Sequence, residues 1–263
     1  NNDRIAIVQS DDIQVEISGD FELSALIQDV SRLGNELLIE LDNDSTVLSN
    51  YYQNLQKKEE LLPYSLQFSI SMENPISYLA PFVSDLYISD EIVLYGGFSQ
   101  GEKTDLSINF TSDSINYQNK AFTNNFYALS ITKESKAERV FSQLEIYSDK
   151  QYWTKQIITD DLKSVWSWDR NQINFSLIAN PPDSSNSLNL KGDILFEEDI
   201  TELQFDTSVV KLDGHIFEFN EDHNITYLVD SGSHKVDVNN LILSDGSQSL
   251  ADNGIWYQAI STE

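Results

Sequence analysis

Ile92-Val93-Leu94-Tyr95-Gly96-Gly97-Phe98 is the stretch that best indicates how this chain folds. Successive side chains of a β-strand point to opposite faces, so Ile92, Leu94, Gly96 and Phe98 would share one face. A glycine therefore replaces a side chain on the apolar face of the strand. Glycine inside a strand marks a bend or a close approach of another backbone, and glycines are one means of curving a sheet. The stretch predicts a sheet that curls around its own apolar face.

The same apolar-x-apolar-x-Gly-x-apolar pattern occurs in three other places. The further copies are Val15-Ile17-Gly19-Phe21, Leu188-Leu190-Gly192-Ile194 and Val210-Leu212-Gly214-Ile216. We predict that Gly19, Gly96, Gly192 and Gly214 face the concave side of the sheet and permit its curvature. The pattern alone leaves a second interpretation open, in which these are strand-end glycines of a β-sandwich.

Alternation of apolar and polar residues dominates the rest of the chain. It is clearest at Ile13-Val15-Ile17, Leu37-Ile39-Leu41, Leu66-Phe68-Ile70, Leu106-Ile108-Phe110, Ile173-Phe175-Leu177, Leu203-Phe205 and Val236-Val238. One apolar and one polar face is typical of antiparallel strands. We therefore predict an all-β fold, a curved antiparallel sheet that forms an open hydrophobic groove.

Two stretches have a different period. Residues 45–62 carry apolar side chains at helical spacing, with Asp44 or Ser45 placed to cap the helix, and residues 74–83 indicate a short helical turn between prolines. Nothing resembles a flexible linker. We predict one elongated domain over residues 1–263, with a single helical insertion at about 45–83.

Composition excludes several classes of function. Acidic residues number 43 and basic residues 16, which gives a net charge of −27. Such a chain is repelled by nucleic acid and by anionic membrane surfaces. Without cysteine it has neither disulfides nor thiolate chemistry. It contains no apolar run long enough for a membrane-spanning helix. It begins and ends within its strand pattern, which we expect of a fragment of a longer protein.

The sequence contains no pattern that predicts an enzyme. The histidines His215, His223 and His234 lack the spacing of a metal site, and pairs such as Glu197-Glu198 reflect the general excess of acid. We predict no catalytic residues, no metal and no cofactor.

The aromatic residues are more informative. Trp166 and Trp168 share one face of a predicted strand. Ile173 and Phe175 lie on the strand that follows, after a turn at residues 169–171. Three interpretations remain open for this apolar surface: ordinary core, the wall of a lipid groove, or a platform on which a sugar stacks.

The C-terminal third of the chain resembles a known family. Leu188-Asn189-Leu190-Lys191-Gly192-Asp193, then Val210-Lys211-Leu212-Asp213-Gly214, and finally Val236 to Gly254 are similar to the TamB (translocation and assembly module) group of AsmA-like proteins, in the form found in Bacteroidetes. Leu62 to Leu86 and Gly96 are similar to the preceding part of the family. The resemblance covers about residues 60–255.

The resemblance implies a non-enzymatic, lipid-conducting β-groove. Such proteins cross the periplasm of Gram-negative bacteria from an inner-membrane anchor, carry phospholipid toward the outer membrane, and work with a BamA-like barrel partner. The anchor and the barrel-docking part would lie outside this chain. The predicted partners here are phospholipid acyl chains. The predicted groove lining is Ile17, Phe21, Phe68, Leu94, Phe110, Trp166, Trp168, Phe175, Leu190, Phe205, Leu212 and Val238.

Two competing functions remain from the residues themselves. One is a secreted β-sandwich for adhesion or carbohydrate binding that uses Trp166, Trp168 or Trp256. The other, weaker, is a glycosidase-like β enzyme. A groove leaves its apolar strand faces open along one side, a sandwich closes them, and an enzyme needs a converging polar pocket.

Overall fold

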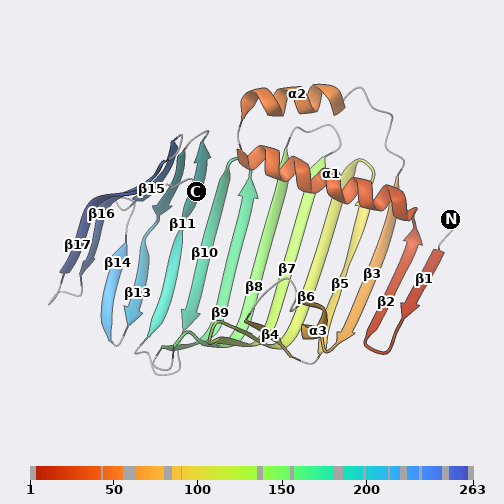
Figure 1. The fold of residues 1–263 in the computed structure, drawn as a ribbon, viewed down its shortest axis with the longest axis horizontal. Helices are drawn as coiled ribbons and strands as arrows, with labels where there is room; N and C mark the ends of the chain where they lie inside the picture. Colours follow the sequence, from red (N-terminus) through yellow and green to blue (C-terminus); the bar gives the residue numbers. More distant parts are fainter. Residues whose placement is uncertain are drawn as a thin grey trace.

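The chain folds into one large antiparallel sheet that curves without closing, with helices laid along one of its faces (Figure 1). This computed structural model describes residues 4–42, 44–55, 63–79, 85–89, 91–134, 139–154, 157–180, 186–197, 200–212, 214–219, 224–230, 233–244 and 249–259. The predicted fold class is confirmed. A sandwich of two sheets is wrong for the described residues, because all of their strands belong to the same sheet.

The strands follow one another as short-range hairpins over most of the chain. In order they are β1 Arg4–Gln9, β2 Ile13–Asp20, β3 Tyr64–Glu73, β4 Leu86–Ile88, β5 Glu91–Gln100, β6 Lys103–Tyr117, β7 Lys120–Glu134, β8 Val140–Tyr152, β9 Ile158–Asp169, β10 Gln172–Asn180, β11 Ser187–Glu197, β12 Ile200–Phe205, β13 Ser208–Leu212, β14 His215–Phe219, β15 Asn224–Asp230, β16 Ser233–Ser244 and β17 Ser249–Ala259.

Antiparallel pairing joins β1, β2, β3, β5, β6, β7, β8, β9, β10 and β11 in that order. The short strand β4 pairs with the far end of β6. The sheet then branches, because β11 pairs with β12 along one half and with β13 along the other. From β12 the pairing continues through β15 to β16 and β17, and β13 pairs with β14. The order therefore matches a meander whose two ends do not meet.

The principal helix was not expected from the sequence. Helix α1 spans Leu23–Asp42, so the predicted strand at Leu37-Ile39-Leu41 and the confinement of helices to 45–83 are both wrong. The alternation at 37–41 is incidental to a longer helical pattern, in which Leu26, Val30, Leu33 and Leu37 recur at intervals of three or four residues. These side chains pack on the sheet, and that burial decides the structure.

The other helices agree better with the sequence. Helix α2 spans Ser45–Leu55, and Asp44 caps it, because its Oδ1 accepts hydrogen bonds from the backbone N–H groups of Thr46 and Val47 at 2.8 and 3.0 Å. Helix α3 is a single turn at Ile76–Leu79. The strand β3 lies between α2 and α3, so residues 45–83 are not one continuous insertion.

Register keeps the same face of the sheet apolar across many strands. Residues paired directly across neighbouring strands lie on the same face. We define the first floor row as the paired residues Ile17, Phe68, Gly96, Ile108, Leu129, Leu144, Trp166, Phe175, Gly192 and Phe205. One residue further along each strand, the opposite face carries the outer row: Ser18, Gln67, Gly97, Ser107, Ser130, Gln143, Ser167, Asn174, Asp193 and Gln204.

Two of the predicted glycines belong to the first floor row, where neighbouring backbones approach closely. A Cβ on Gly96 would lie 1.9 Å from the carbonyl oxygen of Ser107, and one on Gly192 would lie 2.1 Å from that of Gln204. The rings of Phe68 and Phe175, their partners across the sheet, cover these glycines. Glycine is therefore required at both positions by the space available.

The other two glycines behave differently. Gly19 lies next to the last residue of β2 with φ of 135°, and a Cβ there would meet the carbonyl oxygen of Ser65 at 2.3 Å. Gly214 lies in the turn between β13 and β14 with φ of 86°, and no atom lies within 4 Å of its Cβ position. The prediction that Gly214 lies inside a curved strand is wrong, because that glycine serves the positive φ of a turn.

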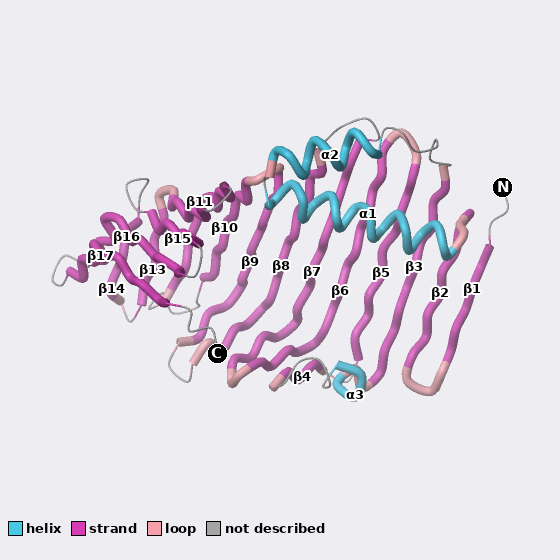
Figure 2. Tube along the Cα trace, turned by 45° about the horizontal axis from the view of Figure 1, so that its top comes forward, coloured by secondary structure: helices cyan, strands magenta, loops and turns pink. Residues whose placement is uncertain are grey.

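The long strands also bend near their lower ends. Asn124 and Asp161 have positive φ values of 49° and 52°, and the register brings Asn124 opposite Asp149, whose Oδ2 accepts a 2.8 Å hydrogen bond from the Asn124 amide. Figure 2 shows the ends of β6 to β9 turning aside below the main body of the sheet. Asparagine and aspartate tolerate this backbone conformation better than most residues, so the bend follows from the sequence.

We predict that Gly96→Ala destabilises the fold by about 3 kcal/mol, because the new methyl group must displace the backbone of β6 and the ring of Phe68. Gly34→Ala is the matched control, since nothing lies within 4 Å of its Cβ position in α1. Alanine should stabilise that helical site by about 0.5–1 kcal/mol. Urea denaturation of both variants measures the difference. Equal stability of the two variants would contradict the close approach at Gly96.

Candidate hydrophobic groove

The floor of the candidate site consists of two adjacent apolar rows. Beside the first floor row runs the second floor row, made of the paired residues Val15, Ile70, Leu94, Phe110, Tyr127, Ile146, Ser164, Leu177 and Leu190. At about 4.8 Å per strand, the floor extends roughly 45 Å across the sheet, and the two rows lie about 7 Å apart. Most of these side chains are half-buried, so they are neither sealed in a core nor fully in water.

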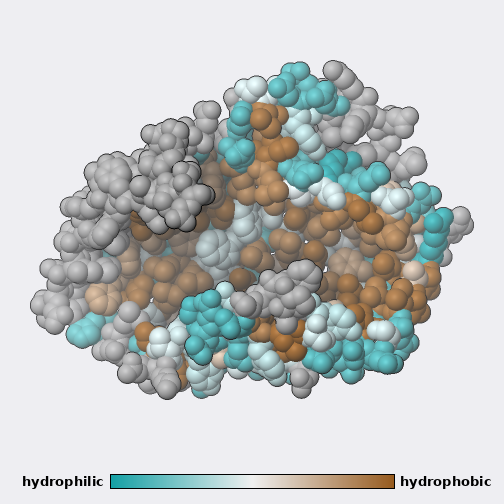
Figure 3. All heavy atoms as spheres, in the orientation of Figure 1, coloured by the Kyte–Doolittle hydropathy of each residue, from teal (hydrophilic) through white to brown (hydrophobic). Residues whose placement is uncertain are grey.

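A third row on the same face lies beneath α1. Leu66, Phe98, Leu106 and Ile131 are buried there against Leu33, and Phe68, Ile108 and Leu129 of the first floor row contact the same cluster at its edge. Figure 3 shows apolar side chains gathered in a hollow below α1, with hydrophilic residues along its upper and lower borders. The helix therefore covers one edge of the apolar face and leaves the two floor rows open.

The part of the floor beyond β8 is aromatic. The rings of Trp166 and Phe175 are stacked with centroids 5.3 Å apart, Phe175 contacts Phe205 edge to face at 6.4 Å, and Phe205 lies 5.0 Å from Phe219. Trp168 pairs with Ile173 in the neighbouring row. These rings form a continuous apolar surface from β9 to β14.

Helix α1 is attached to the sheet by buried polar contacts. Lys133 of β7 forms an ion pair with Glu36, whose side chain is fully buried. The carboxylate of Glu40 accepts hydrogen bonds from the Val140 backbone N–H at 2.9 and 3.1 Å. Because each carboxylate has a partner on the sheet, these contacts fix the position of the helix.

Tyrosines extend this network. Tyr64 donates a 2.8 Å hydrogen bond to Asp29, and Tyr51 and Tyr52 of α2 donate to Glu36 and Glu40 at 3.2 and 2.9 Å. Arg32 bonds Asp29 and the side chain of Gln100, at 2.9 Å each. The network thus joins α1 to α2 and to the ends of β3 and β5.

Burial shifts pKa values within this network. Desolvation raises the pKa of Tyr51 to about 12, and the charge of Glu36 beside it acts in the same direction. Burial likewise raises the pKa of Tyr64, with further contributions from its hydrogen bond to Asp29 and that residue's charge. Both hydroxyls therefore remain protonated donors. Burial also raises the pKa of Glu40, although its hydrogen bonds to Val140 and Tyr52 oppose the shift.

The predicted lining is partly brought together. Ile17, Phe68, Leu94, Phe110, Trp166, Phe175, Leu190 and Phe205 lie in the two floor rows. Trp168 lies in the adjacent row, and Phe205 is more buried than expected. Phe21 is wrong as a lining residue, because it belongs to the buried core with α1. The side chains of Leu212 and Val238 lie outside the described part of the structure.

Sequence reasoning missed several floor residues in β7 and β8, namely Tyr127, Leu129, Leu144 and Ile146. The alternation of Tyr127, Leu129 and Ile131 was a usable signal for this part. It also missed the contribution of α1.

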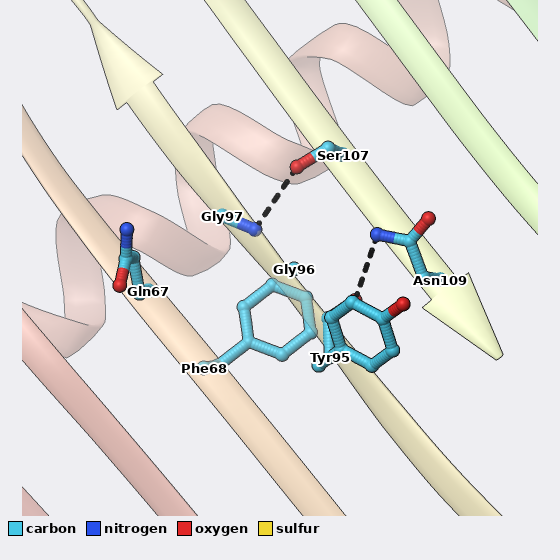
Figure 4. A pocket seen from close by; sticks show the side chains of 7 residues that line it. All are labelled: Gln67, Phe68, Tyr95, Gly96, Gly97, Ser107 and Asn109. Carbon is cyan, nitrogen blue, oxygen red and sulfur yellow. Dashed lines mark hydrogen bonds between the residues drawn. The ribbon is translucent and has the colours of Figure 1, made fainter.

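The outer face has a shallow recess of about 390 Å³, where Gly97 lacks a side chain (Figure 4). The hydroxyl oxygen of Ser107 accepts a 3.2 Å hydrogen bond from the Gly97 N–H, and the amide of Asn109 donates to the Tyr95 carbonyl at 3.5 Å. Gln67, Phe68 and Gly96 complete its wall, and no carboxylate, histidine or lysine is among the lining residues that could activate the Ser107 or Tyr95 hydroxyl. The recess offers no catalytic constellation.

Comparison with protein-family models, curated proteins and solved structures finds no match for this chain. Among the described residues, no helix has the length and hydropathy needed to cross a membrane. The same part of the chain holds no cluster of acidic and histidine side chains suited to a metal ion. His215 is exposed at the start of β14, whereas His223 and the side chain of His234 lie outside the described residues.

We predict that Lys133→Met destabilises the protein by about 3 kcal/mol, because the buried Glu36 carboxylate loses its nearest cation and keeps only the Tyr51 hydroxyl and the more distant Arg32 as partners. The double variant Glu36→Leu with Lys133→Met should recover most of this loss, since an apolar pair replaces the ion pair. Chemical denaturation of the two variants and the parent chain tests this. A double variant as unstable as the single one would show that the ion pair is not what holds α1 in place.

Proposed function

We propose that this chain is a non-enzymatic lipid-conducting segment, which binds phospholipid acyl chains along its hydrophobic groove. The observation that carries the proposal is the pair of floor rows, which stay in register and largely apolar from β2 to β11 on the part of the sheet face that α1 leaves open. An open apolar surface of this extent normally marks a binding site.

An acyl chain matches the chemistry of the floor. The rows offer aliphatic and aromatic side chains, with Ser164 and the hydroxyl of Tyr127 as the few polar groups among them. Burial of an acyl chain against such a surface is favourable by about 0.8 kcal/mol per CH₂ group. Because this attraction has no preferred direction, a lipid can slide along the floor without breaking specific bonds. Transport rather than tight storage is the function that such a surface supports best.

The polar outer row and the overall charge favour an aqueous compartment around the groove. A net charge of −27 disfavours direct binding to anionic membrane surfaces, so we expect the lipid to come from a partner or from a lipid surface without net charge. By its resemblance to TamB and other AsmA-like proteins, we place this segment in the periplasm of a Gram-negative bacterium. The inner-membrane anchor and the BamA-like barrel partner would belong to other parts of the full-length protein.

Carbohydrate binding fits the groove less well. A sugar ring stacks on an open aromatic face, but Trp166 is stacked against Phe175 at an interplanar angle of 26°. The indole N–H of Trp166 is also occupied, since it donates a 2.7 Å hydrogen bond to Ser164. The aromatic part of the floor is therefore better suited to apolar contact than to a hydroxyl-rich ligand.

We predict that photo-crosslinking residues placed at Phe110 and Phe175 capture phospholipid, whereas the same residues at Ser130 and Asn174 on the outer face do not. Phe110 and Phe175 belong to the floor rows, and Ser130 and Asn174 belong to the outer row. Purified protein is irradiated with vesicles of phosphatidylethanolamine and phosphatidylcholine, which carry no net charge, and adducts are counted by mass spectrometry. Equal labelling of both sets would rule out a groove-specific interaction.

We predict that Leu94→Asp abolishes lipid capture with only a modest loss of stability, about 1–2 kcal/mol. The carboxylate would stand in the path of the acyl chains, yet on an open floor it can still reach water. Tyr95→Asp is the matched control, because this adjacent residue is exposed on the outer face and should leave capture unchanged. Melting curves and lipid crosslinking are compared. Unfolding by Leu94→Asp would indicate a sealed core instead of an open groove.

A further inference from the structure

Helix α1 has an exposed apolar side that the fold does not use. Leu23, Ile27 and Leu38 are exposed by 58%, 59% and 64% of their surfaces. At about 100° per residue, these three side chains fall within one narrow sector of the helix. With Gly34 and Leu41 they form a stripe along the helix, which we call the crest. Exposed leucine and isoleucine are unexceptional one at a time, but an aligned stripe on one helix requires an explanation.

The crest lies on the groove side of α1. It continues from Val30 and Leu37, which pack against the same buried cluster as Phe68 and Ile108 of the first floor row. The exposed polar residues Ser24, Gln28, Ser31 and Asn35 occupy the other half of the exposed surface. That half lies toward Arg32 and Glu36, the residues that face α2 and the sheet edge. Figures 1 and 2 place α2 on the far side of α1 from the open part of the sheet.

The helix is held rigidly in this position. Its carboxylates Asp29, Glu36 and Glu40 are buried and bonded to Tyr64, Lys133 and Val140 of the sheet. Removal of α1 from the sheet would leave these buried polar groups without partners, which is costly. The helix therefore does not act as a lid, and the apolar crest stays beside the floor at all times.

We propose that the apolar side of α1 is a permanent wall of the groove, and that its crest contacts the acyl chains of phospholipid bound on the floor. This inference rests on the proposed function and adds to it a second binding surface. We infer the same ligand for the wall and the floor because their apolar surfaces are continuous: the crest, Val30 and Leu37 form one side, and the floor rows form the other. A helix of 20 residues is about 30 Å long, so the wall borders about two thirds of the floor.

A ligand bound between wall and floor must be narrow and apolar. A folded protein domain cannot lie flat on the floor rows while α1 stands above their edge. A charged peptide finds no cation or anion on the crest to pair with. An acyl chain satisfies both conditions, and it can bury two sides of its surface instead of one. Toward the C-terminal end of α1, which contacts both β8 and β11, the floor side of the groove is formed by aromatic rings.

Photo-crosslinking in matched pairs tests the wall. A crosslinker at Ile27 is compared with one at Gln28, and one at Leu38 with one at Asn35. All four positions are exposed, and in each pair the first residue lies on the crest and the second on the polar half of the exposed surface. Phe110 on the floor is the positive reference. With vesicles of phosphatidylethanolamine and phosphatidylcholine, we expect Ile27, Leu38 and Phe110 to capture lipid at least about fivefold more than Gln28 and Asn35.

The possible outcomes distinguish a failure of the proposed wall from a failure of the proposed lipid-binding function. Capture at Phe110 but no excess at Ile27 and Leu38 over their controls would overturn the wall and leave the proposed function intact. Failure at Phe110 as well would overturn both. Equal capture at all five positions would show nonspecific contact with vesicles, and would also overturn both.

Substitution of the crest provides an independent measurement. The double variant Ile27→Ser with Leu38→Ser should keep the melting temperature of the parent, because both side chains are exposed. It should weaken binding of a pyrene-labelled phosphatidylcholine by about tenfold. The control Ile27→Leu with Leu38→Met keeps the wall apolar and should bind as the parent does. Unchanged binding in the serine variant would overturn the wall.

Discussion

Strand register is the constraint on which the rest of this structure depends. Side chains alternate with a period of two, so a slip of one residue between any two strands would turn the apolar set of the following strands outward. From Ile17 on β2 to Phe205 on β12, each pairing brings an apolar residue or a glycine opposite another. The floor is continuous because the register of every pair of strands places the apolar residues on the same face of the sheet. Short connections between successive strands help to maintain the agreement, since few alternative registers remain within reach of a short turn.

The glycines of the first floor row show how the register is combined with curvature. At Gly96 and Gly192 a neighbouring carbonyl oxygen occupies the space that a Cβ would need, so the strands come closer on the apolar face than side chains would permit. The rings of Phe68 and Phe175 then cover the gap and keep the face apolar. A sheet that is concave on its apolar side gathers its side chains toward a common axis. Curvature thus converts a flat apolar face into a trough.

The strands and their common apolar face could be predicted from the sequence, because alternation such as Leu106-Ile108-Phe110 persists over many residues. Helix α1 could have been predicted from Leu26, Val30, Leu33 and Leu37, but the alternation at Leu37-Ile39-Leu41 competed with that pattern. The placement of Phe21 and Gly214 could not be predicted, since one depends on where α1 docks and the other on where a hairpin turns. The network around Glu36 and Lys133 joins residues 97 positions apart, which local patterns do not report.

The way α1 is attached determines what remains available on its surface. A helix on a sheet is usually held by its apolar side, which is then consumed by packing. Here, ion pairs and hydrogen bonds from Asp29, Glu36 and Glu40 supply part of the attachment, and Leu33 with its neighbours supplies the rest. Much of the apolar surface of the helix is therefore free of the sheet.

An open apolar face can also pack against the sheet of another molecule. Helix α1 limits this packing more than it limits the binding of a thin hydrocarbon chain. Because the helix stands above one edge of the floor, a second flat sheet cannot approach closely enough to pack against both floor rows. The acidic surface adds repulsion between copies of the chain, since each carries a net charge of −27. Neither obstacle acts on a flexible hydrocarbon chain, which is thin enough to enter below the helix and carries no charge along its length. The same helix that narrows access to the groove would thereby favour the acyl chains that we propose as its ligand.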